Sequence, residues 1–117
     1  MRTPNFGKPV RGSRTGRPIM MVLDVLGRRT VLRILWELQA GPMSFRTLQE
    51  ACATNSAHLN ARLRELRALD LVELVENGYQ LTAEGWKLRD ALMPLAEWAR
   101  RWGRSATARA AMAQESE

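Results

Sequence analysis

The chain is 117 residues long, which is enough for one domain with a single core but too short for two independent ones. A hydrophobic content of 45%, with 8 glycines and 5 prolines, is typical of a folded globular protein. One cysteine and one histidine exclude an internal disulfide bond and a zinc cluster. We therefore expect no metal, no cofactor and a reducing, cytoplasmic setting.

The net charge of +6 is concentrated at the start of the chain. Residues 1–17 contain five cations and no acid, in a Pro, Gly, Ser and Thr context that predicts a mobile basic tail, whereas the remaining residues contain 13 cations and 12 acids. Charge therefore supports a polyanionic partner only weakly. The apolar run 19–26 contains Asp24 and is much shorter than the roughly 20 residues needed to cross a bilayer, so no membrane span is expected.

Two helices are predicted after the tail. The first runs from Pro18 to a stop at Gly27, because proline is favoured at the first helical position and glycine just past the last. The second covers about residues 29–39, where apolar residues recur at helical spacing. Its apolar stripe is wide, and we expect Leu32 and Trp36 to belong to the buried face.

A helix-turn-helix is predicted next. Ser44 is placed to cap a short helix over residues 45–52, and a tight turn leads into a longer helix over about residues 56–69. The apolar residues of the longer helix return at helical spacing: Leu59, Leu63 and Leu66. Three successive residues are candidates for its N-cap: Thr54, Asn55 and Ser56.

A β-hairpin is predicted around Asn77-Gly78. Two short apolar runs flank this pair, and Asn-Gly is the strongest short signal for a two-residue turn because both turn positions require positive φ. Thr82 can then cap a last helix that reaches about Gly103, and residues 104–117 are expected to fray. The folded domain would span residues 18–103.

The order of these elements is more informative than any one of them. Two helices joined by a short turn and followed at once by a hairpin match the winged helix-turn-helix, whose second helix enters the major groove of DNA. The predicted fold class is therefore mainly α with a small β-hairpin, a winged helix-turn-helix with helical dimerisation elements at both ends.

Four groups of segments then point to a known family. They are LDVLGRRT at 23–30 with ILWEL at 34–38, GPMSFRTL at 41–48, RLREL at 62–66 with LVE at 71–73, and YQLTAEG at 79–85. These segments resemble those of the HxlR-type transcriptional regulators, within the MarR-like winged-helix group, over roughly residues 17–103. The resemblance implies a homodimeric, bacterial-type DNA-binding regulator whose terminal helices pair the subunits.

The chain departs from that family at several positions. The family often has a sensor cysteine just before the first helix, where this chain has Arg17, so redox sensing at that position is excluded. Cys52 stands where the family has an apolar residue, and it is predicted to be a packing residue. Thr30 replaces a usual tryptophan. Glu73 and Glu76 lie near a truncated wing and argue against phosphate contact there.

The longer helix of the helix-turn-helix is predicted to read DNA. With its leucines inward, its outward face carries Ala57, Asn60, Ala61 and Arg64. Asparagine suits the N6/N7 edge of adenine, arginine the O6/N7 edge of guanine, and alanine a thymine methyl group. Ser56 and Arg46 are placed to hold phosphates. A solvated polar face is the alternative interpretation.

A dimer interface is predicted from the first and last helices. Its residues are Met21, Val22, Val25, Leu88, Leu92, Leu95, Trp98 and Trp102. The four tryptophans, at 36, 86, 98 and 102, are compatible with an effector pocket between the second and last helices, but core and dimer packing explain them more simply. His58 is expected to be a surface or boundary residue without a catalytic or metal partner.

The leading prediction is a sequence-specific transcriptional regulator that binds double-stranded DNA through the helix at about residues 56–69. The alternative is a winged-helix module for protein association without specific DNA binding. The predicted outward face with Asn60 and Arg64 favours DNA, while the nearly neutral folded part and the acidic wing favour association. No nucleophile, phosphate loop or carboxylate pair stands out, so an enzyme is not predicted.

Overall fold

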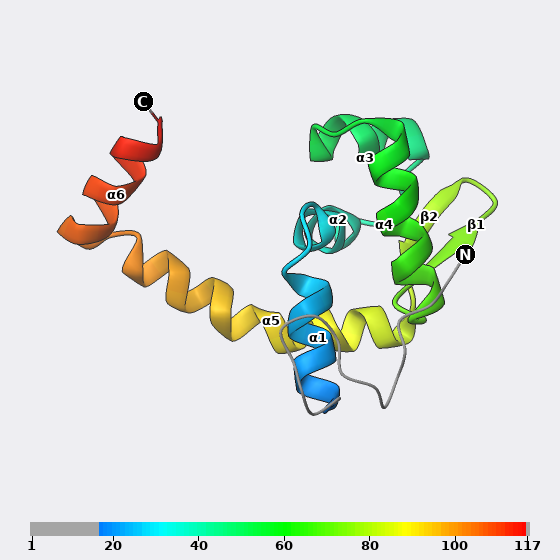
Figure 1. Ribbon diagram of the computed structural model, residues 1–117, viewed down its shortest axis with the longest axis horizontal. Coiled ribbons are helices and arrows are strands. Elements are labelled where there is room, and N and C mark those ends of the chain that lie inside the picture. Colours follow the sequence, from blue (N-terminus) through cyan, green and yellow to red (C-terminus); the bar gives the residue numbers. More distant parts are fainter. Residues whose placement is uncertain (1–16, 117) are drawn as a thin grey trace.

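The computed structural model describes residues 17–116, and Figure 1 shows their arrangement. The elements are α1 (Pro18–Leu26), α2 (Val31–Leu38), α3 (Phe45–Cys52), α4 (Ser56–Ala68), β1 (Val72–Val75), β2 (Gly78–Leu81), α5 (Ala83–Trp102) and α6 (Ala106–Ser116). The mainly helical winged helix-turn-helix with a two-stranded antiparallel hairpin is confirmed. Of the predicted basic tail, only Arg17 falls within the described residues.

Helices α3, α4 and α5 begin at side-chain caps. Ser44 caps α3, Asn55 caps α4 and Thr82 caps α5, each accepting a hydrogen bond from the backbone N–H three residues further on, at 3.1, 2.7 and 3.0 Å. Asn55 is thus the cap among the three candidates before α4. Each such cap contributes about 1 kcal/mol to helix stability, so these side chains fix where the helices start.

The core lies between α2, α3, α4 and the hairpin. Its buried members are Val25 of α1, Val31, Ile34, Leu35 and Leu38 of α2, Leu48 of α3, Leu59, Leu63 and Leu66 of α4, with Val72 and Leu81 from the strands. Burying one such side chain contributes roughly 1.5–3 kcal/mol. Hydrophobic burial therefore orients α4 with its leucines inward, as predicted.

The predicted burial of Leu32 and Trp36 is wrong. Both side chains are exposed, because the core contacts α2 only through the face that carries its four buried residues. The neighbouring stripe of α2 instead borders an open groove beside α5.

The predicted hairpin is present, but its turn differs. The turn residues are Glu76 and Asn77, neither of which has positive φ, while Gly78 is already the first residue of β2. Gly78 has a φ of +141°, and a Cβ there would lie 2.2 Å from the carbonyl oxygen of Met43. Met43 exchanges two backbone hydrogen bonds with Tyr79, at 2.9 and 2.8 Å. The glycine is therefore required by its own positive φ and by this tertiary approach, and not by a position inside the turn.

The predicted fraying of residues 104–117 is also wrong, because α6 occupies most of this segment. The Oγ of Ser105 accepts a hydrogen bond of 3.1 Å from the N–H of Ala108, and Ala108 is buried. Alanine-rich sequence has high helix propensity, which the sequence interpretation undervalued. Figure 1 shows α5 extending away from the helix-turn-helix and α6 turning at its far end.

Gly41 and Gly78 both have positive φ, but only Gly78 has other atoms close to the position of an added Cβ. Comparing alanine variants of the two glycines therefore distinguishes the cost of a steric clash from the cost of backbone strain. Gly41 has a φ of +126° with nothing within 4 Å of an added Cβ, so Gly41→Ala should destabilise the fold by about 1–2 kcal/mol through strain alone. Gly78→Ala adds the clash with Met43 and should cost about 3 kcal/mol or more. Urea unfolding of both variants measures the difference, and equal costs would contradict the crowding at Gly78.

Candidate nucleic-acid interface

The turn between α3 and α4 sets the direction of the candidate reading helix. Ala53, just after α3, adopts a left-handed conformation with a φ of 52°, and Asn55 caps α4 two residues later. The three leucines of α4 are buried in the core. The opposite side of α4 is consequently held toward solvent.

The predicted DNA-contacting residues lie on or beside this outward side. Ser56, Ala57, Asn60 and Arg64 are exposed, and Ala61 is half-buried at the edge of the same face. On α3, the side chain of Arg46 is 90% exposed, and its Nε is 4.0 Å from Glu50 Oε2. The structure thus presents an asparagine and an arginine one helical turn apart, with small residues beside them.

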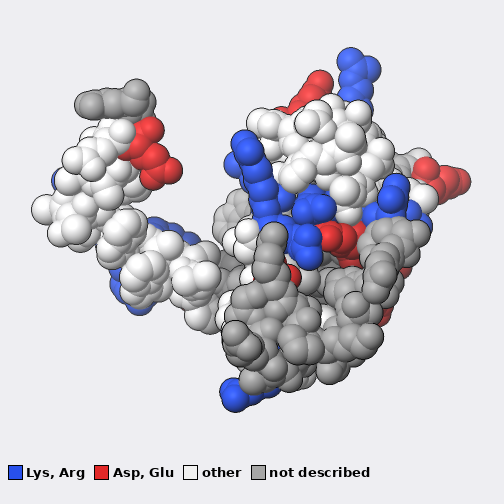
Figure 2. All heavy atoms as spheres, viewed as in Figure 1, with Lys and Arg blue, Asp and Glu red and all other residues white. Residues whose placement is uncertain are grey.

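Two guanidinium groups of α4 make no ion pair within residues 17–116: those of Arg64 and Arg67. Arg67 is not among the residues predicted from the sequence, although its position three residues after Arg64 places it on the same side of the helix. Both arginines line an open groove of about 620 Å³ between α4 and β1, which Glu73 also borders. Figure 2 shows Lys and Arg side chains gathered over the region of α2 and α4, with acids between them.

The wing beside this groove is acidic. Glu73 and Glu76 are exposed, and residues 72–81 contain no cation. Gln80 Nε2 donates a hydrogen bond of 2.6 Å to Glu73 Oε2, which holds that carboxylate on the sheet surface. Because carboxylates repel phosphates, the cations available for a polyanion lie on the helix rather than on the wing.

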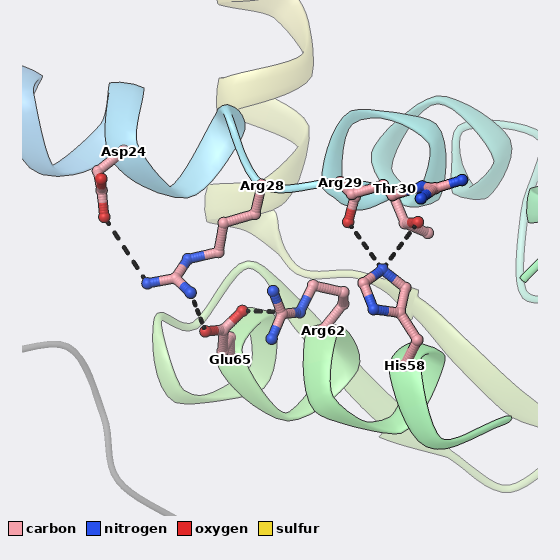
Figure 3. A network of polar contacts seen from close by, with 7 residues as sticks. All are labelled: Asp24, Arg28, Arg29, Thr30, His58, Arg62 and Glu65. Carbon is pink, nitrogen blue, oxygen red and sulfur yellow. Dashed lines mark hydrogen bonds and ion pairs between the residues drawn. The ribbon is translucent and has the colours of Figure 1, made fainter. Parts of the chain in front are cut away.

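The opposite edge of α4 contacts the junction between α1 and α2 (Figure 3). Arg28 Nη1 lies 3.2 Å from Glu65 Oε2. His58 Nε2 lies 3.2 Å from the carbonyl oxygen of Arg29 and 3.1 Å from Thr30 Oγ1. The sequence pattern predicts only a surface or boundary position for His58 and not these contacts, which join positions about 30 residues apart.

Comparisons with known proteins place the chain in a family. A family described as "Domain of unknown function (DUF7347)" matches residues 20–92. The chain belongs to the DUF7347 family.

This DUF7347 chain is also similar to named regulators. It is 26% identical over 88 residues to an uncharacterized HTH-type transcriptional regulator of Methanocaldococcus jannaschii, covering 71% of the chain and 83% of that protein. Quinone-bound YodB from B. subtilis matches with a TM-score of 0.67 and 27% identity, over 71% of the chain and 96% of YodB. A possible HxlR family transcriptional factor from Thermoplasma volcanium matches with a TM-score of 0.66 and 27% identity, over 76% and 87% of the two chains. The resemblance to HxlR-type regulators is confirmed.

The apolar residues predicted for the dimer interface differ in how far the chain itself buries them. Met21 and Val25 are already buried within this one DUF7347 chain, and Leu88 and Leu92 are half-buried. The exposed members are Val22, Leu95, Trp98 and Trp102. The rings of Trp98 and Trp102 stack with centroids 5.8 Å apart, so they form one apolar surface on α5.

The tryptophans do not pack in the core of the single chain. All four are exposed, and Trp36 lines a groove of about 360 Å³ between α2 and α5 together with Leu32, Leu92 and Leu95. A second apolar groove, of about 610 Å³, lies between α1 and α5 and includes Val22 and Leu88. Within residues 17–116, no helix is long and apolar enough to cross a membrane, and no three His, Cys, Asp or Glu residues form a possible metal site.

Cys52 packs at the end of α3 against the core and is half-buried. Burial raises the pKa of the Cys52 thiol, with Arg33 acting in the opposite direction. A raised pKa reduces the thiolate fraction at neutral pH, and the thiolate is the reactive form. The environment of this thiol therefore disfavours reaction with oxidants.

Native Cys52 should react with a thiol reagent more slowly than in the urea-unfolded chain, and its reactivity should rise at higher pH than that of the unfolded thiol. Cys52→Ala should cost about 1 kcal/mol of stability because it removes a packed sulfur atom. A thiol titration across pH, with the unfolded chain as control, tests this. Rapid labelling of the native chain at neutral pH would show that burial does not protect the sulfur.

Proposed function

We propose that this chain is a transcriptional regulator that binds double-stranded DNA sequence-specifically with α4 in the major groove. The observation that carries the proposal is the outward face of α4, where Asn60 and Arg64 are exposed next to small residues. The transcriptional regulators to which the chain is similar support a DNA-binding role in general. Such a role requires the chain to act where the chromosome lies, which in a prokaryotic cell is the cytoplasm.

Each residue of the interface has a role set by its chemistry. Arg64 would bind the O6/N7 edge of guanine in a bidentate manner, and Asn60 the N6/N7 edge of adenine. Ala57 and Ala61 leave room for close approach and can contact thymine methyl groups. Ser56, at the first turn of α4, and Arg46 on α3 would bind phosphates, helped by the backbone N–H groups at the start of α4.

The alternative function is protein association without specific DNA binding. The acidic wing and the exposed tryptophans of α5 favour it. DNA binding gives a phosphate or a base edge to each of the two arginines of α4 that lack an ion pair in the described part of the chain, and we therefore place it first.

Replacing Arg64 by Ala should weaken binding by about 1–3 kcal/mol per contact and relax the preference at one base pair in each half-site. Asn60→Ala should act in the same way at a different base pair. Lys87→Ala is the matched control, because Lys87 is an exposed cation on α5 away from this face. A random-library DNA selection followed by binding titrations measures both effects. Unchanged affinity and base preference in both variants would favour the association function.

We also propose that the chain acts as a homodimer, with the exposed residues of α5 and Val22 of α1 at the interface. The exposed side chains of Leu95, Trp98 and Trp102 lie on one helix, and adjoining exposed apolar side chains are typical of association surfaces. A two-fold dimer would present α4 twice, in major grooves about 34 Å apart, and predicts an imperfect palindrome. The grooves beside α5 have the size of ligand sites, so a small-molecule effector is compatible with this arrangement.

Leu95 and Leu74 provide a matched test of the dimer. Their exposed fractions are similar, 58% and 54%, but Leu95 lies on α5 and Leu74 on β1. Leu95→Asp should raise the dimer dissociation constant by about 30-fold, corresponding to roughly 2 kcal/mol, because it buries a charge in an apolar interface. Leu74→Asp should leave the dimer intact. Sedimentation at micromolar concentration distinguishes them, and a monomeric unmodified chain would rule the dimer out.

A further inference from the structure

We infer that His58 and Glu65 are positioning residues that hold α4 in the orientation needed to discriminate bases. They do so by anchoring one edge of the helix to the junction between α1 and α2. Neither residue lies on the face proposed to contact DNA. The inference rests on the proposed function, because it concerns how well α4 discriminates between DNA sequences and not whether α4 binds DNA.

The two anchors are spaced to control orientation. His58 and Glu65 are seven residues apart, so they lie on one edge of α4 about 10 Å apart along its axis. Their partners, Arg28 to Thr30, are three consecutive residues of the junction. The buried leucines of α4 set its depth, but hydrophobic contacts are non-directional. Two polar contacts on one edge restrict both rotation about the helix axis and tilt.

The His58 anchor is directional. A carbonyl oxygen only accepts hydrogen bonds, so a hydrogen bond across the 3.2 Å between His58 Nε2 and the carbonyl of Arg29 requires the tautomer with the hydrogen on Nε2. The same nitrogen lies 3.1 Å from the hydroxyl of Thr30. Thr30 itself has a φ of 82°, a left-handed conformation that is rare for a β-branched residue. A glycine would adopt this backbone without strain, but it would lack the hydroxyl that faces His58.

The Glu65 anchor is a partly buried charge cluster. Its carboxylate lies between Arg28, at 3.2 Å, and Arg62, at 3.1 Å, and Arg28 also reaches Asp24 of α1 at 3.7 Å. The exposed fractions of these four side chains lie between 12% and 29%, so solvent screens them less than a surface pair. Glu65 thereby connects α4 to α1 as well as to the junction (Figure 3).

The test compares binding of the full chain to a duplex selected from a random library and to a scrambled duplex. His58→Leu should lower the ratio of the two affinities by about tenfold, comparable with losing one base contact, while affinity for scrambled DNA stays unchanged. His58→Gln should restore most of the ratio, because a glutamine amide can donate to the Arg29 carbonyl. Thr30→Gly should lower the ratio while leaving the free energy of unfolding equal or higher.

Arg28→Gln tests the second anchor and has a matched control. Arg33→Gln breaks a 2.7 Å ion pair with Glu37 on α2, which does not involve α4. Arg28→Gln should lower the affinity ratio and Arg33→Gln should not. Urea unfolding of every variant provides the stability scale.

Three results would overturn the inference. The first is that the ratio of affinities for selected and scrambled DNA is the same in His58→Leu and Arg28→Gln as in the unmodified chain. Another is a ratio that follows the free energy of unfolding across all variants, including Thr30→Gly, which would mean that these residues only stabilise the fold. A third is His58→Gln behaving like His58→Leu. If the unmodified chain prefers no sequence, the proposed function itself fails, which is a distinguishable outcome.

Discussion

Burial of three leucines on one side of α4 is the constraint on which the rest of this structure depends. Leu59, Leu63 and Leu66 meet the apolar face of α2 and the base of the hairpin, and together they contribute several kcal/mol of hydrophobic free energy. Because the helix period is fixed, burying these positions determines that Asn60 and Arg64 point outward. A polar substitution within this stripe would disturb the core and the outward face together.

Local signals in the sequence predicted most of the fold for physical reasons that act over a few residues. The caps at Ser44 and Thr82 need only a side-chain oxygen next to a helix start, and the leucine spacing of α4 needs only the helical period. Gly78 shows where this reasoning stops. The sequence pattern places Gly78 inside a local turn, whereas in the structure it begins β2, where the absence of a Cβ lets the strand backbone approach Met43, 35 positions away.

The candidate site divides in the same way. The outward position of Asn60 and Arg64 follows from helix geometry and could be predicted, but the contact of His58 with Arg29 and Thr30 depends on how α1, α2 and α4 pack. The exposure of Trp36 also could not be predicted from local sequence. An apolar residue at helical spacing indicates a wide apolar stripe, but periodicity does not say whether the chain itself supplies the element that covers it.

Charge is distributed so that the helix, and not the wing, would supply attraction to a polyanion. Arg64 and Arg67 stand on α4, while Glu73 and Glu76 stand on the adjacent wing. Phosphate attraction acts on every sequence alike, whereas base contacts act only on the preferred one. Acidic groups beside the arginines reduce the attraction to phosphates but do not affect the base contacts. Sequence preference would therefore depend more heavily on how accurately the orientation of α4 is fixed. Reduced phosphate attraction would lower the affinity of a single α4 for DNA, and two copies of the helix on one duplex would raise the affinity through multivalency.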